Sequence, residues 1–435
     1  EGRLPRRLGA WSTAAVTVGI MIGSGIFRVP AVAAGATGTP GTMLLVWVVG
    51  GLVAMCGALA LAEVAALYPD AGGMYVYLRE AFGPLTAFLF GWLYLVVMPA
   101  GAGAIALVFA EYLGRLVPLG PGQIRGVAVG LILVLAAAQY RSVRFGAAIQ
   151  NASTIAKVLA ILAMTAAAFL LAAPGTGAWS GEPSPLGSNW GGFGLGVVAV
   201  LWAYNGWQDV TCLSGEVRDP GRALPRAIVG GTLTVVAVYL LANAAYLRVL
   251  SIEEIARSPL VAADLAVRLV GPAGSALIAA LVCVSTFGSL NAVIMAIPRV
   301  FWAMADDGLF FRSVAAVHPR YRTPHVAICA LAGLSILYLA LRSFEQLVEA
   351  FVLASLPFWA LGVASVIVLR REQPELPRVY RTPGYPLVPL LFVAAMIALV
   401  VNSLWEHPET TATSLGAIAA GVPLYYGWRW LGARR

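Results

Sequence analysis

The chain has 435 residues, of which 60% are hydrophobic and 11% are charged, and its mean hydropathy is +0.85. A soluble domain of this length is not so apolar, so the composition indicates a polytopic membrane protein. The formal net charge of +8 does not indicate a nucleic-acid partner, because the arginines gather in short loops at every second helix end, as the positive-inside rule predicts. We therefore expect a multi-pass protein of the plasma (inner) membrane with both termini in the cytoplasm.

Apolar runs of about 20 residues, each long enough to cross a bilayer, divide the chain into about twelve helices. The chain lacks the short alternating segments of a membrane barrel, and we expect an all-α fold. The predicted spans are residues 13–38, 41–67, 84–115, 123–140, 147–172, 192–216, 226–249, 271–303, 326–342, 347–369, 386–404 and 412–430.

The first span is interrupted near its middle by Gly23, Ser24 and Gly25. Gly19 and Gly23 alone form a GxxxG pattern, which is typical of close helix packing. The added Ser24 and Gly25, together with a similar interruption in the sixth span, favour a broken helix instead. Arg28 follows the break, either as a base that reaches the membrane surface or as an external gate charge.

Two ionisable residues of the next spans differ in what they indicate. Glu63 lies near the cytoplasmic end of the second span, where it is either a proton site or the partner of a loop arginine. Lys157 is the only lysine of the chain and lies in the apolar run 146–173. An ammonium at that depth, about 16 Å from the start of its span, costs about 2.5–3.5 kcal/mol on insertion scales. We expect Lys157 to face a polar cavity and to bind oxygen atoms.

The sixth span carries the second interruption, at residues 203–207. Two broken helices five spans apart are typical of an inverted 5+5 repeat. The first repeat is then residues 13–172 and the second is residues 192–369. Residues 386–430 add two helices, and residues 1–12 and 431–435 are cytoplasmic. Asp209, just past the second interruption, either pairs at a gate or takes part in coupling.

The two breaks together predict the kind of ligand. Unwound backbone at membrane depth is tolerated where it lines a cavity. The N-terminus of a half-helix carries about +0.5 charge and free N–H groups that suit a carboxylate, and unwound carbonyl groups suit an ammonium. A ligand with both groups on one carbon is an α-amino acid.

The remaining segments add less. Residues 252–255 and 264–268 predict short external helices that could serve as a lid. The four cysteines all lie inside predicted spans, so structural disulfides and a zinc site are not expected, nor is any cofactor. Tyr246 in the seventh span either belongs to an interfacial aromatic belt or has a role at the site.

Five stretches resemble the amino acid–polyamine–organocation (APC) superfamily, and within it the bacterial relatives of the L-type amino acid transporters. They are Ile22–Phe27, Ala62–Tyr75, Trp202–Trp207 with Gly215–Pro220, Asn243–Tyr246 and Phe287–Asn291. The resemblance implies the LeuT-like 5+5 fold with discontinuous helices one and six, and a transporter that is not an enzyme.

The family's site roles carry over to the matching positions. Similar proteins bind the substrate carboxylate at the position of Gly23–Gly25 and the amine through carbonyls of both breaks. An aromatic residue at the position of Trp202 is the family's external gate. The substrate-binding set implied is Ile20, Met21, Gly23, Ser24, Gly25, Ile26, Trp202, Ala203, Tyr204, Asn205 and Gly206.

The resemblance also implies a coupling site. Lys157 occupies the place of sodium in sodium-coupled relatives, so sodium independence is implied, and Tyr246 works with it through polar contacts. Gly19, Ser285, Thr286 and Ser289 are the expected partners of the ammonium, and no metal is expected. Animal members of the branch bond to a heavy chain through an external cysteine, which the loop 116–123 lacks, so that partner is not expected.

We therefore predict a sodium-independent exchanger of neutral L-amino acids that works by alternating access. Two alternatives stay open: a proton-coupled symporter, in which Lys157 loses its proton in each cycle, and a transporter of cationic amino acids or polyamines with the same fold. A membrane-embedded enzyme is disfavoured, because no HExxH, GxSxG or paired-aspartate motif occurs. A channel is not excluded by the sequence, and substrate counterflow would separate it from a carrier.

Overall fold

The computed structural model describes residues 4–172, 190–258, 260–341, 344–406 and 408–432. Within these ranges the secondary structure is helical, apart from one isolated parallel β-bridge between Leu8 and Val217. The prediction of an all-α membrane protein is confirmed.

The helices of the first half are α1 (Ala10–Met21), α2 (Gly25–Thr37), α3 (Pro40–Leu67), α4 (Met74–Phe82), α5 (Pro84–Leu116), α6 (Pro121–Arg141) and α7 (Val143–Leu171). Those of the second half are α8 (Trp190–Tyr204), the 3-10 helix η2 (Asp209–Glu216), α9 (Pro220–Val249), α10 (Ile252–Arg257), α11 (Val261–Val270), α12 (Ala273–Ala296), α13 (Pro298–Asp306), η3 (Arg312–Ala315), α14 (His325–Leu341), α15 (Phe344–Glu372), α16 (Leu387–Glu406), α17 (Pro408–Ala419) and α18 (Gly421–Gly432). Proline opens several of them, where its missing N–H costs no helical hydrogen bond.

Eight of the described helices are long and apolar enough to cross a membrane, or nine when α1 and α2 count as one bent span. The other three predicted spans correspond to α8 with η2, to α14 with 17 residues, and to α17 with α18, of 12 residues each. The span predicted at residues 412–430 is not one continuous helix, because α17 ends at Ala419 and α18 begins at Gly421. Pro423 has no N–H to donate to the carbonyl of Ala419, where α17 ends, so the helical ladder is interrupted there.

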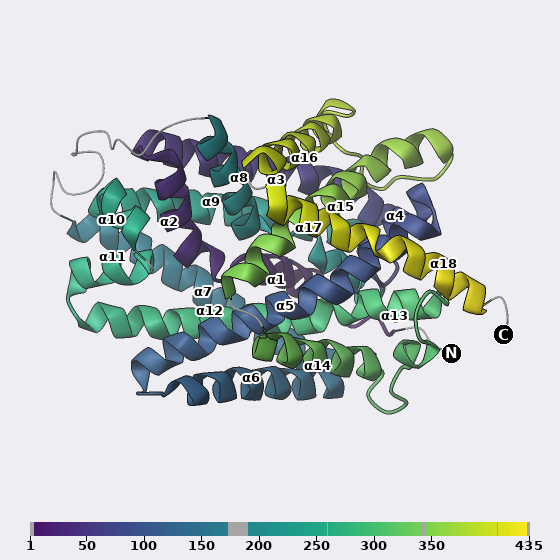
Figure 1. Cartoon of the computed structure of the whole chain (residues 1–435), viewed down its shortest axis with the longest axis horizontal. Coiled ribbons are helices and arrows are strands. Elements are labelled where there is room, and N and C mark those ends of the chain that lie inside the picture. The colour runs from purple at the N-terminus through teal and green to yellow at the C-terminus, as the bar shows by residue number, and fades with distance from the viewer. Residues whose placement is uncertain (1–3, 173–189, 259, 342–343, 407, 433–435) are drawn as a thin grey trace.

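The two halves of the bent first span lie between different neighbours. α1 packs against α7, α9 and α12, whereas α2 packs against α8 and α10. Long flanking helices enclose them, with α3 along α9 and α5 along α12. In Figure 1 both ends of the chain lie at one end of the long axis, and α10 and α11 lie at the other. The helices α10 and α11 confirm the two short helices predicted for this region.

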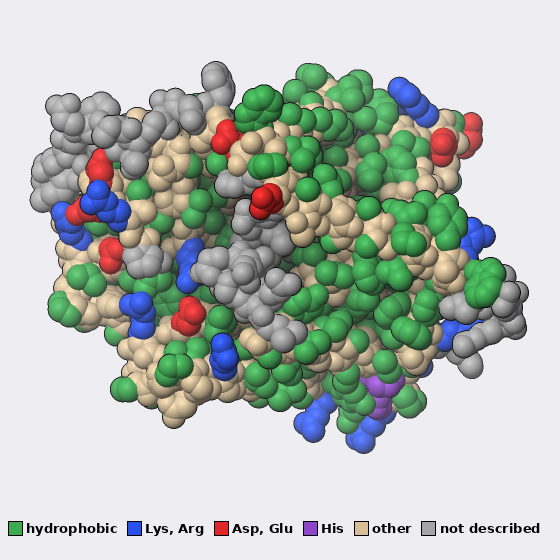
Figure 2. All heavy atoms as spheres, viewed as in Figure 1, with side chains coloured by type: hydrophobic (Ala, Val, Ile, Leu, Met, Phe, Trp, Pro, Cys, Tyr) green, Lys and Arg blue, Asp and Glu red, His purple; other side chains and the backbone are tan. Residues whose placement is uncertain are grey.

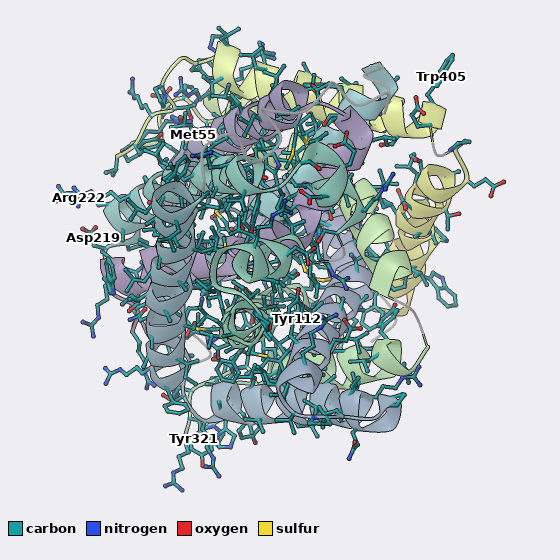
Figure 3. The ribbon with its side chains drawn as sticks, turned by 90° about the vertical axis from the view of Figure 1, so that its left-hand side faces the viewer. Met55, Tyr112, Asp219, Arg222, Tyr321 and Trp405 are labelled. Atoms are coloured by element: carbon teal, nitrogen blue, oxygen red, sulfur yellow. The ribbon has the colours of Figure 1, made fainter. Side chains whose placement is uncertain are left out.

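The outer surface between these two ends is apolar. Figure 2 shows hydrophobic side chains over much of this face, while many of the charged ones gather toward the ends. The side chains of Leu133, Leu170 and Leu277 are 53%, 82% and 66% exposed. Soluble monomeric proteins rarely expose a large contiguous apolar surface. Seen along the long axis, Tyr321 and Trp405 lie at the periphery and Tyr112 lies inside the bundle (Figure 3). The chain is therefore a multi-pass membrane protein.

Glu63 ties α3 to the segment that joins α15 to α16. Its carboxylate is 2% exposed and accepts hydrogen bonds from Arg370 (2.7 and 2.8 Å) and from the backbone N–H of Thr382 (2.7 Å). The Nε atom of Arg378 lies 3.2 Å from the same carboxylate. Of the two roles considered for Glu63, the structure shows pairing with arginines, one in the last turn of α15 (Arg370) and one in the loop that follows it (Arg378).

We expect Glu63→Ala to lower the free energy of unfolding by about 3–5 kcal/mol, because the change strands buried donors that had a charged partner. Thermal unfolding of the purified protein in detergent measures the effect. Glu375→Ala, an exposed carboxylate of the same connecting segment, is the matched control and should change the unfolding temperature little. Equal stability of the two variants would contradict this role for Glu63.

Candidate functional site

The first membrane span is broken where the sequence predicts. The axes of α1 and α2 differ by 40° across the residues Ile22–Ser24. In a continuous helix the N–H of Gly23 would bond the carbonyl of Gly19, but here it donates to Met21 at 2.9 Å. The carbonyls of Gly19 and Ile22 are thus left for other donors at a depth where lipid supplies none.

The ammonium of Lys157 supplies those hydrogen bonds. Its Nζ atom lies 2.8 Å from the carbonyl oxygen of Gly19 and 2.6 Å from that of Ile22. The carbonyl of Ser285 and the hydroxyl of Ser289, both on α12, lie at 3.2 and 3.1 Å. Lys157 is fully buried, and its three N–H donors meet four oxygen atoms. The nitrogen of Lys157 is thus surrounded by oxygen atoms of α1 and α12 and of the break between α1 and α2.

Thr286 does not join this site, contrary to the prediction. Its hydroxyl donates to the carbonyls of Val282 (2.7 Å) and Cys283 (3.3 Å) one turn earlier on α12. Ser289 is only three residues away and lies on nearly the same face of α12, but the hydroxyl of Thr286 is used by carbonyls of its own helix.

Two tyrosines of α9 bind the other side of the break. Tyr239 donates from its hydroxyl to the carbonyl of Met21 at 2.8 Å, and Tyr246 donates to that of Ile26 at 3.3 Å. The hydroxyl of Tyr246 thus bonds α2, and its joint role with Lys157, implied by the resemblance, stays a prediction. Tyr239 was missed, although its spacing of seven residues from Tyr246 places both on one helix face.

The second break touches the first. α8 ends at Tyr204, and Gly206 has a φ of 112°, which favours glycine. A Cβ atom on Gly206 would lie 2.5 Å from Cγ2 of Ile20. A Cβ on Gly25 would lie 2.8 Å from the Cα of Ala203. The two interrupted segments therefore approach each other backbone to backbone.

A cavity of about 90 Å³ lies beside these segments. Since one water needs roughly 10–15 Å³ by the same measure, the cavity has room for several waters or a small organic ligand. Its described lining comprises Ile20, Met21, Gly23, Ser24, Gly25, Met98, Gly101, Ala102, Ala104, Ile105, Trp202, Ala203, Asn205, Asp209, Ser289 and Val293. Most of the residues predicted to bind substrate are in this set.

Three of the predicted residues lie elsewhere. Ile26 is fully buried away from the lining, and Gly206 packs on Ile20. The hydroxyl of Tyr204 donates to the carbonyl of Trp47 at 3.2 Å, and its ring lies against the rings of Trp47 and Tyr239. Tyr204 is therefore part of the packing behind the break.

The sequence analysis did not predict that α5 forms one wall of the cavity. Met98, Gly101, Ala102, Ala104 and Ile105 belong to this helix and line the cavity. The run of glycine and alanine between Pro99 and Ile105 was the available signal, because small residues leave space at helix interfaces.

At the end of the molecule that holds the chain termini, the N-terminal segment is bound to the end of η2. The N–H groups of Arg7 and Leu8 donate to the carbonyl of Glu216 at 2.8 Å each, and the N–H of Arg218 donates back to Leu8 at 2.8 Å. The carboxylate of Glu216 pairs with Arg299 at 2.7 Å, and both side chains are fully buried. Beyond this clamp, Leu4, Arg6 and Asp307 are among the residues that line a polar hollow of about 430 Å³.

At the opposite end, Arg28 of α2 lies 3.7 Å from Glu111 of α5, with both side chains partly exposed. This ion pair spans two walls of the bundle, which favours the gate interpretation of Arg28. The neighbouring α10 begins with a capping box in which Ser251 and Glu254 bond each other's backbone. The backbone N–H of Ser251, and then Arg268, hold the pKa of Glu254 below its usual range.

The chain matches the amino acid permease family over residues 8–426. It is 30% identical to the serine/threonine exchanger SteT of Bacillus subtilis (strain 168) over 99% of this chain and 98% of that protein. It is 32% identical to the human large neutral amino acids transporter small subunit 2 over 97% of this chain and 80% of that protein. The human b(0,+)-type amino acid transporter 1 is 31% identical over 93% and 84%.

We expect Gly25→Ala to weaken binding of an α-amino acid at least about tenfold, because the new methyl group would meet the backbone of Ala203 at 2.8 Å and push the two breaks apart. Gly35→Ala, on the same helix with open space around its Cβ position, is the control. The rise in unfolding temperature on adding each of a panel of L-amino acids measures binding. Retention of the wild-type response by Gly25→Ala would count against this geometry.

Proposed function

Because the chain belongs to the amino acid permease family of the APC superfamily, we propose that it exchanges neutral L-amino acids across the membrane by alternating access. Membership of this family makes it an amino acid transporter and not an enzyme. The relatives SteT and the large neutral amino acids transporter small subunit 2 support exchange and a neutral substrate.

The observation that carries the proposal is the contact between the two broken helices beside the cavity. In this proposal the first N–H groups of α2, at Gly25 and beyond, hold the substrate carboxylate, since this N-terminus has no side-chain cap. The carbonyls near Ile20 and Trp202 hold the ammonium. Trp202, which is partly exposed at the edge of the cavity, closes over the substrate.

Lys157 supports independence from sodium. Its ammonium already binds the oxygen atoms that a metal cation in this place would need. A sodium ion would have to displace a tethered positive charge, so coupling to sodium is disfavoured. Because Lys157 bonds α1 to α12, it links the state of the break to the rest of the bundle.

We also infer the orientation and the partners. The positive-inside distribution of arginines supports a cytoplasmic location for both termini in the plasma membrane, and thus places the clamp of Leu8 and Val217 on the cytoplasmic side. The connection between α5 and α6, residues 117–120, has no cysteine, which supports a carrier that works without a disulfide-linked partner.

Counterflow in proteoliposomes tests this function. Vesicles are loaded with unlabelled L-serine or left empty, sodium is absent, and a pH gradient is imposed or collapsed. We expect uptake of labelled L-serine into loaded vesicles that is at least about tenfold above uptake into empty ones and indifferent to the pH gradient. A channel gives no such trans-stimulation, and uptake into empty vesicles that follows the proton gradient would favour the symporter instead.

In the same assay we expect Lys157→Ala to lower the initial exchange rate at least about tenfold. The carbonyls of Gly19 and Ile22 lose their shortest hydrogen bonds and keep only the longer ones from the hydroxyls of Ser285 and Ser289, and a buried group left unpaired costs about 1–3 kcal/mol. Ile155 is on the outer surface of α7 with its side chain 45% exposed, so Ile155→Ala is the control and should exchange amino acids like the wild type. Exchange by Lys157→Ala at the wild-type rate would contradict the proposed role of Lys157 in coupling the break to the rest of the bundle.

A further inference from the structure

Asp209 is the one charged side chain among the described residues that line the cavity. It is the first residue of η2, directly after the second break, and it is 3% exposed. The other described lining residues are apolar, glycine or neutral polar. A carboxylate in such a place is a functional hypothesis by default, because burial of an anion is costly unless it is paired.

The protein supplies Asp209 with a neutral partner. The hydroxyl of Tyr94 on α5 donates to its Oδ1 atom at 3.1 Å. Across the described ranges, the ion pairs of this chain leave Asp209 without an arginine, lysine or histidine within 4.0 Å. The gate-side ion pair considered for Asp209 from the sequence is therefore not formed in this structure. A carboxylate accepts about four hydrogen bonds, so capacity remains on the cavity side.

The rest of the cavity separates into two kinds of wall. The backbone of the breaks, around Gly23 and Ala203, suits the two charged groups that every amino acid shares. Met98, Ala102, Ile105 and Val293 form apolar surface, and Asn205 and Asp209 add polar atoms. Apolar surface discriminates weakly between side chains of one shape, whereas a buried acceptor discriminates strongly against a ligand that leaves it unpaired.

We propose, given the amino acid exchange proposed above, that Asp209 determines substrate specificity by accepting a hydrogen bond from a donor on the substrate side chain. The donor is a hydroxyl or an ammonium group. The carrier then prefers amino acids with such a donor to aliphatic ones of the same shape. Tyr94 holds the carboxylate in position from behind.

Two isosteric pairs test the preference in the wild-type protein. L-threonine and L-valine differ by a hydroxyl in place of a methyl group, and L-2,4-diaminobutyrate and L-norvaline differ by an ammonium in place of one. Each is used to inhibit the exchange of labelled L-serine. We expect the donor-bearing member of at least one pair to inhibit at concentrations at least about tenfold lower than its partner. Equal inhibition within both pairs would overturn the proposal.

Variants assign the preference to the carboxylate. Asp209→Ala should reduce the ratio within the preferred pair to about one. Asp209→Asn keeps an acceptor oxygen and loses the charge, so it should retain a preference for threonine and lose one for diaminobutyrate, which distinguishes the two donors. Tyr94→Phe removes the bond that positions the carboxylate but keeps the acceptor, so it should reduce the preferred ratio without abolishing it. If Asp209→Ala weakens inhibition by all four compounds equally and leaves the ratio unchanged, Asp209 has a structural role only.

The preference within each pair is also measured without transport, by comparing the concentrations of the two compounds that raise the unfolding temperature in detergent equally. Failure of counterflow with an intact threonine or diaminobutyrate preference would reject exchange and keep the role of Asp209. Counterflow without a preference for threonine or diaminobutyrate would support exchange and reject the role of Asp209.

Discussion

A helix broken inside a bilayer leaves carbonyl groups that lipid cannot hydrogen-bond, and in this chain the ammonium of Lys157 binds two of them. The interaction satisfies both sides. The carbonyls at the C-terminal end of α1 carry partial negative charge, and the buried ammonium requires oxygen partners. Because Ser285 and Ser289 of α12 complete the site, one side chain of α7 joins three helices at the point where α1 must stop.

The break also depends on α9. Tyr239 and Tyr246 bind the carbonyls of Met21 and Ile26, so the unwound segment has donors on both sides. Lys157 and the tyrosines hold the break open while leaving the N-terminus of α2 uncapped by a side chain. A ligand carboxylate there would complete the set of hydrogen bonds, which gives a physical reason for proposing an amino acid site at this break.

The sequence predicted those parts that disturb an apolar pattern. Glycines at mid-span, the single lysine and the second break at residues 203–207 stand out because each is costly in a membrane. The partners of Lys157 were predicted less well. Ser289 and Thr286 are three residues apart on nearly the same helix face, and the sequence does not show that the hydroxyl of Thr286 bonds back to its own helix while that of Ser289 meets Lys157. Tyr246 and the α5 wall depend on how helices pack, which apolar periodicity does not specify when a helix is apolar all round.

The claim that Lys157 holds the break is tested most directly by hydrogen–deuterium exchange of the segment from Gly19 to Ile26 in the wild type and in Lys157→Met, a change that keeps an apolar stem of similar length. The account predicts faster exchange of this segment in the variant, with α3 unchanged as the internal reference, because the unwound backbone loses its buried donor. Equal protection of the segment in both proteins would contradict it.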